Sequence, residues 1–253
     1  MGVRQNVTYD LGSTAGAPHT AAMIRPDLSR LAIAAVAATA SLLTACGSIT
    51  PVSMSDSARA RIHVVSVDPD IKMPPEPVLL DRGQSAAMML GGPLLGAAIA
   101  NNTAAEPRAQ LVAEMQTNHI VLGDIVASEF SKKASAGGPM KFEVGTAPAD
   151  AQVHFTVTSY GLAQAQPFGS TLYPLINVSA VMQAPDGTIL WQAKEIVGAL
   201  DRDNKQGQTF ADYAKDPELL RQAFASVSAI ASHKLTDNLM GLEKAQGTPG
   251  IQQ

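Results

Sequence analysis

The chain contains a single cysteine, Cys46, so no internal disulfide can support the fold and a hydrophobic core has to hold it alone. The cysteine follows an uncharged, mostly apolar run at residues 31–43, and Arg25 and Arg30 come directly before that run. A run of 13 residues is shorter than the ~20 that a membrane-spanning helix needs, but it suits the apolar part of a targeting signal. The order of positive charges, apolar run and small residues predicts a secretory signal that ends at residue 45.

The residues around the cysteine, Leu43, Thr44, Ala45, Cys46 and Gly47, resemble the lipobox of bacterial lipoproteins. The resemblance implies that a signal peptidase recognises Leu43, Thr44, Ala45 and Gly47 and cuts before Cys46. It also implies a diacylglyceryl group on the thiol and, commonly, an acyl group on the new amine. Position 47 lacks the acidic side chain that favours inner-membrane retention, so the resemblance implies the periplasmic face of the outer membrane. The alternative is a short core helix that ends in a buried thiol.

Acylation of Cys46 would attach the protein to a lipid bilayer without a transmembrane helix. Each buried methylene contributes ~0.8 kcal/mol, and two or more chains give stable anchoring. Removal of residues 1–45 takes away three arginines and two aspartates and moves the net charge from −4 to −5. This mild acidity argues against nucleic acid as a partner, because nucleic-acid binding depends on clusters of basic residues.

Composition divides the chain into five parts. Residues 1–22 precede a second methionine, Met23, and are expected to be a non-native N-terminal extension. The other parts are a lipoprotein signal peptide at 23–45, a flexible linker at 46–57, one periplasmic α+β domain at 58–242 and a disordered tail at 243–253.

The spacing of apolar residues predicts a mainly antiparallel sheet of about four strands. Short β-branched or alternating runs predict strands at residues 61–67, 153–159, 175–183 and 188–197. The turn sequence at 184–187 contains Pro185 and Gly187 and joins the last two strands as an antiparallel hairpin. The proline-rich residues 73–78 are expected to run as an extended surface connection that cannot join a sheet.

Two long helices are predicted to pack on this sheet. Apolar residues three, four or seven apart predict one helix over 108–133, followed by Gly137 and Gly138. A second helix begins with Asp216 as N-cap and Pro217 as first residue, and it stops at Gly241. Helices on one face of a mainly antiparallel sheet give an α+β two-layer sandwich.

Two segments, residues 149–161 and 175–193, resemble a pattern in bacterial envelope lipoproteins. In that pattern one strand ends in an aromatic residue and glycine, and a hairpin carries an Asp-Gly turn followed by tryptophan. The layout is similar to the lipoprotein activators of penicillin-binding proteins and to the N-terminal domain of the propeller protein of the Tol system. The resemblance implies an envelope protein, but it names no activity, because a fold does not fix a function.

Residues 86–100 form an uncharged, mostly apolar segment inside the predicted domain. Gly92, Gly96 and Ala100 fall four apart, so one face of a helix there would let another backbone approach closely. One interpretation is a membrane-dipping or partner-docking hairpin, with Gly92 and Gly96 as partner contacts. The other is a helix that packs on the domain's own sheet, because fifteen residues cannot span a bilayer.

No sequence pattern predicts a catalytic residue, a metal ligand or a cofactor. The histidines after residue 46, at positions 63, 119, 154 and 233, lack the spacing of a zinc motif. Asp201, Asp203 and Asn204 begin like a calcium loop, but positions 205 and 206 lack the next ligand and the turn glycine. Ser170 has no sequence neighbour that would activate it.

Aromatic residues cluster before the predicted hairpin. Tyr160, Phe168 and Tyr173 would form an anchor patch for a partner protein if they were exposed together. Core packing is the expected role of Trp191, whereas Phe168 and Tyr173 stand among glycine and proline and are the better contact candidates.

These features predict a lipid-anchored, non-catalytic accessory protein of the bacterial envelope that binds another envelope protein; neither the partner nor the oligomeric state can be predicted. Two alternatives stay open. The first is a structural subunit of a secretion or export complex that inserts residues 86–100 into a membrane or ring. The second is a small-ligand binder or hydrolase whose site forms only in the folded chain. A pocket lined by convergent His, Asp and Ser would support the second, and a filled sheet face would oppose it.

Overall fold

A computed structural model describes residues 50–81, 83–86, 105–166 and 169–242. In chain order its elements are α2 (Asp56–Arg59), β1 (Val64–Val67), β2 (Val78–Leu80), α5 (Ala105–Thr117), α6 (Leu122–Gly137), β3 (Lys141–Val144), β4 (Ala151–Gln164), β5 (Thr171–Gln183), β6 (Ile189–Val197), β7 (Gln208–Thr209), α7 (Phe210–Lys215) and α8 (Pro217–Met240). The α+β class that the sequence predicts is confirmed.

The described strands form one mixed sheet of seven strands rather than the four that were predicted. Its main order is β3-β1-β4-β5-β6, with β2 added to β4 and β7 added to β5. The long pairs β4–β5 and β5–β6 are antiparallel, which confirms the predicted hairpin, whereas β1 and β2 pair with β4 in parallel. The extra strands are short or pair over long sequence distances, so no local alternation of apolar and polar residues predicts them.

The segment from β1 to β2 runs beside β4 along most of its length. Pairing begins at Val65 opposite Ala151, continues through an isolated bridge between Lys72 and Thr156, and resumes at Val78 opposite Gly161. The prolines between Lys72 and Val78 interrupt the ladder because proline has no backbone N–H to donate. The prediction that residues 73–78 stay out of the sheet is therefore wrong for Val78.

Strand β1 also begins later than the sequence suggests, at Val64 rather than at residue 61. The Asp150 carboxylate accepts hydrogen bonds from the backbone N–H groups of His63 and Val64, at 2.8 and 3.0 Å. The donation from Val64, followed by that from His63, lowers the pKa of Asp150. This contact fixes the entry of the chain into the sheet.

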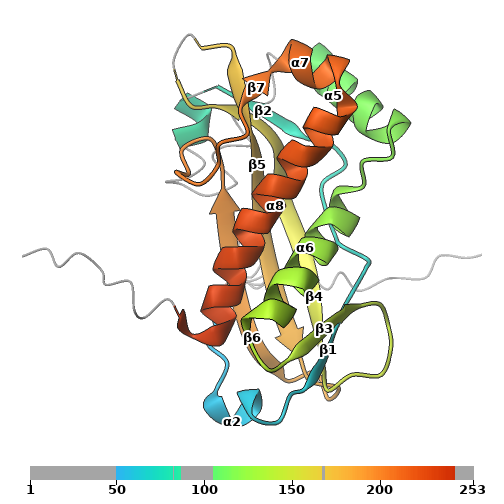
Figure 1. Cartoon of the computed structure of the whole chain (residues 1–253), viewed down its shortest axis with the longest axis vertical. Coiled ribbons are helices and arrows are strands. Elements are labelled where there is room, and N and C mark those ends of the chain that lie inside the picture. Colours follow the sequence, from blue (N-terminus) through green and yellow to red (C-terminus); the bar gives the residue numbers. More distant parts are fainter. Residues whose placement is uncertain (1–49, 82, 87–104, 167–168, 243–253) are drawn as a thin grey trace, which may run out of the picture. The chain divides into compact units, whose positions relative to one another are not determined.

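Helices α6 and α8 lie side by side across one face of the sheet (Figure 1). The core between the two layers is centred on Phe130 of α6, whose ring lies 5.0 Å from that of Phe155 and 5.5 Å from that of Phe142, edge to face in both cases. Trp191 stacks on the same ring at 6.4 Å and is fully buried, as predicted. Packing of aromatic rings in these arrangements adds to the stabilisation from buried apolar area.

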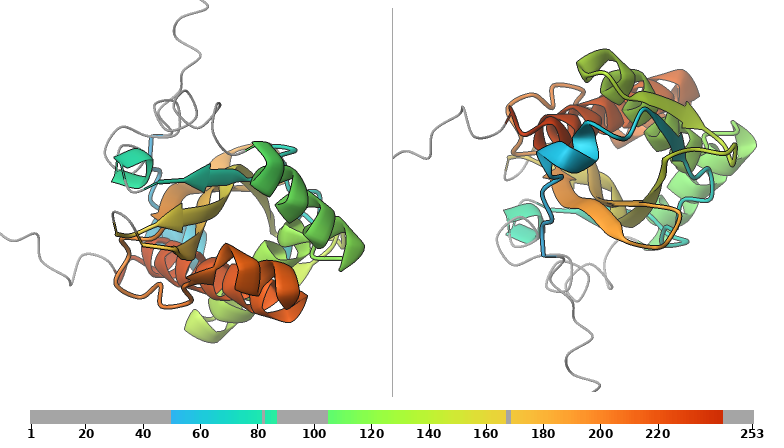
Figure 2. Two further views of the ribbon diagram at one scale, coloured as in Figure 1. Left: turned by 90° about the horizontal axis from the view of Figure 1, so that it is seen from above. Right: turned by 90° about the horizontal axis from the view of Figure 1, so that it is seen from below.

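The helix predicted over 108–133 is instead two helices. Helix α5 ends at Thr117, and α6 begins at Leu122 after a corner in which His119 adopts a φ of 52°. The backbone N–H of Ile120 bonds to the carbonyl of Met115 at 2.8 Å and closes this corner. Apolar spacing continues across the break, which is why periodicity alone misses it. Figure 2 shows α5 standing apart from α6 and α8 at one end of the sheet.

Helix α8 has the ends that the sequence predicts. The Asp216 side chain accepts hydrogen bonds from the N–H groups of Glu218 and Leu219, and Pro217 is the first helical residue. Gly241 ends the helix in the left-handed conformation, at a φ of 74°. The Arg59 guanidinium, on the N-terminal segment, donates to the carbonyl of Leu239 at 3.0 Å. Both ends of the longest helix are therefore satisfied.

The described part of the segment predicted as a linker packs on the domain. Val52 forms an antiparallel bridge with Gln192 on β6, and Met54 is 4% exposed. Ser55 then caps α2 by accepting from the N–H of Ala58. The packed body thus extends N-terminally of residue 58, as far as Val52.

Candidate functional sites

Two hollows lie at opposite ends of β4 and on opposite faces of the sheet. The first, called here the polar cavity, has a volume of about 490 Å³. It is lined by Ser66, Thr146, Ala147, Ala149, Ala151, Gln152, His154, Gln183, Ala184, Pro185 and Gly187. The second, called here the α5 hollow, has a volume of about 280 Å³. It is lined by Met73, Pro75, Val112, Met115, Gln116, His119, Ile120, Val121, Leu122 and Tyr160.

Strand register builds the floor of the polar cavity. Ser66 of β1 lies opposite Gln152 of β4, and Gln152 lies opposite Gln183 of β5. Residues directly opposite each other project to the same face of a sheet, so the three side chains form one row. Their inward-pointing neighbours Val153 and Met182 are fully buried, which places this row on the face away from α6 and α8.

His154 stands in the next row of β4 and has a fixed orientation. Its Nδ1 lies 2.8 Å from Oδ2 of Asp68, while Oδ1 of Asp68 accepts the backbone N–H of Asp70 at 3.0 Å. A hydrogen bond to a carboxylate requires a proton on Nδ1, so the neutral imidazole keeps a lone pair on Nε2. The ring nitrogen left for a ligand is Nε2, which accepts in this neutral form and donates when the ring is charged.

The walls of the polar cavity come from two connections, the loop between β3 and β4 and the turn between β5 and β6. Further along β4, Thr156 and Thr158 are exposed on the same face. Helices α6 and α8 pack on the other face of the sheet. Ser66 and His154 line one pocket. No aspartate is among its lining residues, and Asp68 is linked to it only through His154.

The α5 hollow exists because α5 buries little of itself. Leu111 and Met115 are its buried residues, whereas Val112 and Gln116 of the same helix border the hollow. The opposite wall comes from Met73 and Pro75 in the proline-rich segment. A second space of about 330 Å³, lined by fewer residues, shares Val112 with the α5 hollow. Glu76 and Arg108 are among its other lining residues. The helix thus packs on the domain through Leu111 and Met115 and leaves its other face to border the hollow.

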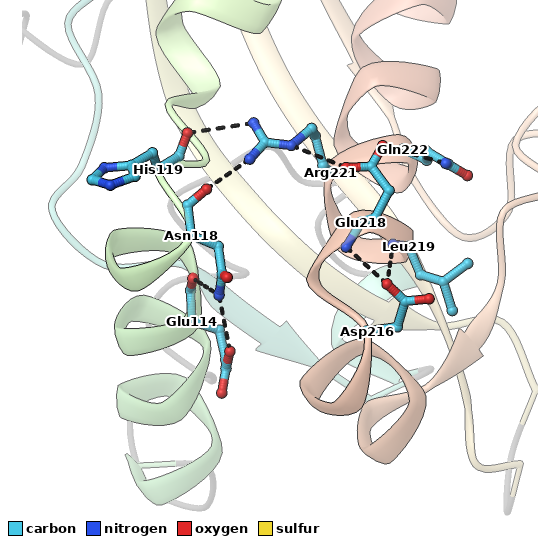
Figure 3. A network of polar contacts seen from close by, with 8 residues as sticks. All are labelled: Glu114, Asn118, His119, Asp216, Glu218, Leu219, Arg221 and Gln222. Atoms are coloured by element: carbon cyan, nitrogen blue, oxygen red, sulfur yellow. Dashed lines mark hydrogen bonds and ion pairs between the residues drawn. The ribbon is translucent and has the colours of Figure 1, made fainter.

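An arginine from α8 holds the C-terminal end of α5 (Figure 3). Arg221 donates to the carbonyl oxygens of Asn118 at 2.6 Å and His119 at 3.3 Å, and its Nε lies 3.3 Å from the Glu218 carboxylate. Asn118 donates back to the carbonyl of Glu114 at 2.9 Å. A cation at a helix C-terminus satisfies carbonyls that have no intrahelical partner, so Arg221 fixes the corner that borders the hollow.

Tyr160 does not belong to an exposed patch, which corrects one of the predicted partner contacts. It is 5% exposed and packs edge to face on Phe224 of α8 at 6.3 Å. Burial raises the pKa of its phenol, and the Glu76 carboxylate raises it further. The residue contributes to the floor of the α5 hollow instead, because a register shift after Val157 turns it to the inner face.

The other predicted contacts have different outcomes. Tyr173 is half-buried against a small cluster formed by Leu80, Ala163, Leu175 and Ala199. Phe168, Gly92, Gly96 and the signal residues Leu43, Thr44, Ala45, Cys46 and Gly47 lie outside the described residues. These contacts and the lipid attachment at Cys46 stay predictions.

The loop that begins like a calcium site is held by protein contacts. Asp201 pairs with Lys234 of α8, and the buried Asn204 donates to the carbonyls of Pro174 and Gly198 at 2.7 and 3.0 Å. Within the described residues, no group of three or more His, Cys, Asp or Glu side chains could hold a metal ion. Histidines 63, 119 and 233 are exposed.

Within the described part of the chain, no helix is both long enough and apolar enough to cross a membrane.

Sequence reasoning missed the polar cavity because its residues come from three strands and two connections. The alternation in β4 does place Gln152 and His154 on the polar face, and that is the one local signal. The neighbouring Ser66 is brought in by parallel pairing over a long sequence distance, which no local pattern reports.

No family model matches the sequence, and no curated protein matches it. Among solved structures, the chain is similar to PelC of Paraburkholderia phytofirmans, described as a dodecamer, at 12% identity and a TM-score of 0.38, covering 76% of this chain and 98% of that one. It is also similar to a protein of Xanthomonas campestris from the family DUF330, at 10% identity and a TM-score of 0.41, covering 79% and 97%. A third is lipoprotein GNA1162 of Neisseria meningitidis, at 16% identity and a TM-score of 0.21, covering 67% and 98%.

Proposed function

We propose that this protein is a lipid-anchored, non-catalytic accessory lipoprotein of the bacterial envelope, held on the periplasmic face of the outer membrane, whose folded domain works by binding. The lipobox-like residues that end at Cys46 supply the anchor, and the α+β domain supplies the binding surfaces. In this proposal the acylated cysteine is the only attachment to the bilayer that is required.

The observation that carries the proposal is the short distance between the cysteine and the packed domain. Val52 already pairs with Gln192 of β6, and it follows Cys46 by six residues. A fully extended chain of that length spans about 20 Å at most. Acyl chains on Cys46 would therefore hold the β6 side of the domain close to the membrane surface, where an envelope partner would meet it in a restricted set of orientations.

The α5 hollow is the surface that we assign to a protein partner. It is lined mainly by apolar side chains, and Val121 beside it is 51% exposed. Apolar groups that enter such a hollow gain about 25 cal/mol per Å² of buried surface. The Arg221 contacts hold the corner in place. Binding of a partner there would therefore cost little free energy for ordering the corner.

Replacement of Cys46 by Ser tests the anchor. We expect the wild-type protein from envelope fractions to have its N-terminus at residue 46 and a mass increased by acyl groups. The Cys46→Ser protein should keep the same thermal unfolding midpoint but lack the acyl mass and leave the outer-membrane fraction. Ser48→Ala is the matched control, since it changes a small polar neighbour and leaves the thiol. Recovery of acylated wild-type mass from Cys46→Ser, or an unmodified thiol in the native protein, would overturn the proposal.

The polar cavity favours a second candidate function, the binding of a small ligand. Hydrogen-bonding groups converge there in a space within the usual 300–1,000 Å³ of small-molecule sites. The remaining alternative, insertion of residues 86–100 into a membrane, falls on residues outside the described part of the chain.

A further inference from the structure

We propose that the polar cavity binds a neutral, polyhydroxylated ligand, namely a saccharide unit of one or two sugars. The residues that carry this proposal are Ser66, Gln152, Gln183 and His154, which all line the cavity. The inference goes beyond the proposed anchor and partner surface, and the binding itself does not depend on lipidation.

The cavity gathers polar side chains that make no hydrogen bonds within the protein. Among the described residues, the side chains of Ser66, Gln152 and Gln183 have no hydrogen-bond partner. Ser66 is 6% exposed as a residue, and its side chain lines the cavity. A ligand that enters the cavity can form hydrogen bonds with these three side chains.

The polar groups of the cavity can both donate and accept hydrogen bonds. Each glutamine amide offers two donors and an acceptor, and each hydroxyl donates and accepts. Nε2 of His154 accepts when the ring is neutral and donates when it is charged. Sugar hydroxyls likewise donate and accept at the same atom, so every group in the row can be satisfied. The described lining contains no lysine, arginine, aspartate or glutamate. The carboxylates close to the cavity are engaged within the protein. Asp68 accepts from His154 and Asp70, and Glu143, opposite Ser66 on β3, pairs with Lys141. Asp150 and Asp186 accept backbone N–H groups. The cavity therefore offers nothing that would favour an ionic ligand.

The source of such a ligand depends on where the domain is anchored, and this step alone rests on the proposed function. His154 lies opposite Val181, Val181 lies opposite Gln192, and Gln192 pairs with Val52. One row across the sheet therefore joins the cavity to the start of the packed domain. With strands about 4.8 Å apart and a tether of about 20 Å, the cavity lies within about 35 Å of the bilayer surface. Free saccharides and glycolipid headgroups can both reach it.

Saturation-transfer NMR on the mature, acylated protein, which begins at residue 46, tests the proposal in nanodiscs. The probes are N,N′-diacetylchitobiose and maltose, two neutral disaccharides, and the comparison ligand is glucose-6-phosphate, which carries charge. We expect transfer from the protein to at least one disaccharide and at least fivefold less transfer to the phosphate ester.

Two variants locate the binding. Ala147→Phe places a large ring on an exposed loop residue at the cavity wall, and Gln152→Ala removes one amide from the row. Each should reduce transfer at least fivefold. Gln222→Ala is the matched control, because it removes an exposed amide on α8 that contacts Glu218, and it should leave transfer unchanged. Circular dichroism melts confirm that all three variants are folded. Absence of transfer to both disaccharides would overturn the proposal, and so would transfer that both cavity variants leave intact.

A second set of nanodiscs that contain a glycolipid with the same sugar distinguishes the two sources. Loss of transfer to the free disaccharide there supports a lipid headgroup as ligand, and unchanged transfer supports a free saccharide. The Cys46→Ser protein, studied without nanodiscs, should still bind the disaccharide. Transfer in that protein together with an unmodified native thiol would overturn the proposed anchor and leave the cavity assignment intact.

Discussion

The indole N–H of Trp191 donates a hydrogen bond to the side-chain oxygen of Asn238 at 2.8 Å. This contact joins β6 to the last turns of α8 inside the core, where Trp191 is fully buried. It connects the two layers of the sandwich at β6. The N-terminal segment pairs with the same strand, through Val52 and Gln192.

Replacement of Asn238 by Ala leaves the buried indole N–H without this partner. We expect the free energy of unfolding to fall by about 1–3 kcal/mol, the cost of an unsatisfied buried donor. In a Trp191→Phe background the same replacement should cost clearly less, because the donor is gone. Denaturant unfolding of the two single variants and the double variant measures this coupling. Additive effects would show that the hydrogen bond contributes nothing by itself.

Gly161 provides a test of the β2 pairing. Its φ is 149°, and a Cβ at this position would lie 1.9 Å from the carbonyl oxygen of Val78. Gly161→Ala should therefore displace β2 and lower the free energy of unfolding by more than the ~1–3 kcal/mol that an unusual backbone conformation alone costs. Gly145→Ala is the control, since Gly145 has a φ of 141° and open space around its Cβ position. Equal losses in the two variants would mean that the clash with β2 is unimportant.

Local pattern predicts the parts of this fold in which one face of an element is buried. In β4, Phe155 and Val157 are buried while Thr156 and Thr158 are exposed, so the alternation in the sequence reports the strand. The ends of α8 are predictable for a similar reason, because Asp216 and Gly241 act on their own helix.

The remaining features depend on contacts between distant segments. The corner at His119 keeps the apolar spacing of one helix across Leu111, Met115 and Leu122, so only the three-dimensional structure shows that the chain turns. Likewise, parallel pairing places Ser66 beside Gln152, and neither residue is unusual in its own segment. The polar cavity could therefore not be read from the sequence.

Arg221 allows the attachment of α5 to be tested separately from the core. Arg221→Ala removes two hydrogen bonds to the carbonyls of Asn118 and His119, so we expect faster amide hydrogen exchange across α5 and a global stability loss of about 1–2 kcal/mol. Arg221→Lys keeps the charge but not the forked donor geometry, and it should give an intermediate effect. Arg202→Ala, at an exposed arginine, is the control. Unchanged exchange in α5 would show that the helix is held by Leu111 and Met115 alone.

The raised pKa of Tyr213 predicts how the free energy of unfolding changes with pH in the alkaline range. Burial raises its pKa to about 12, while an unfolded tyrosine titrates near pH 10. Its hydroxyl donates to the carbonyls of Gln206 and Leu172, at 2.7 and 3.2 Å, which the ionised form cannot do. Because the folded state holds the proton more tightly, the contribution of Tyr213 to stability is complete below pH 10 and is lost as the pH rises toward 12. The loss proceeds at no more than about 1.4 kcal/mol per pH unit.

Tyr213→Phe separates this titration from that of the lysines. The variant should be less stable than the wild type at pH 8, by about 0.5–1.5 kcal/mol for the lost hydrogen bonding, and its stability should fall less steeply between pH 10 and 12. Urea unfolding at pH 8, 10 and 11 measures both slopes. Arg202→Ala, at an exposed arginine, is the control and should leave the pH dependence of the wild type. Parallel slopes for Tyr213→Phe and the wild type would show that Tyr213 does not control the alkaline loss of stability.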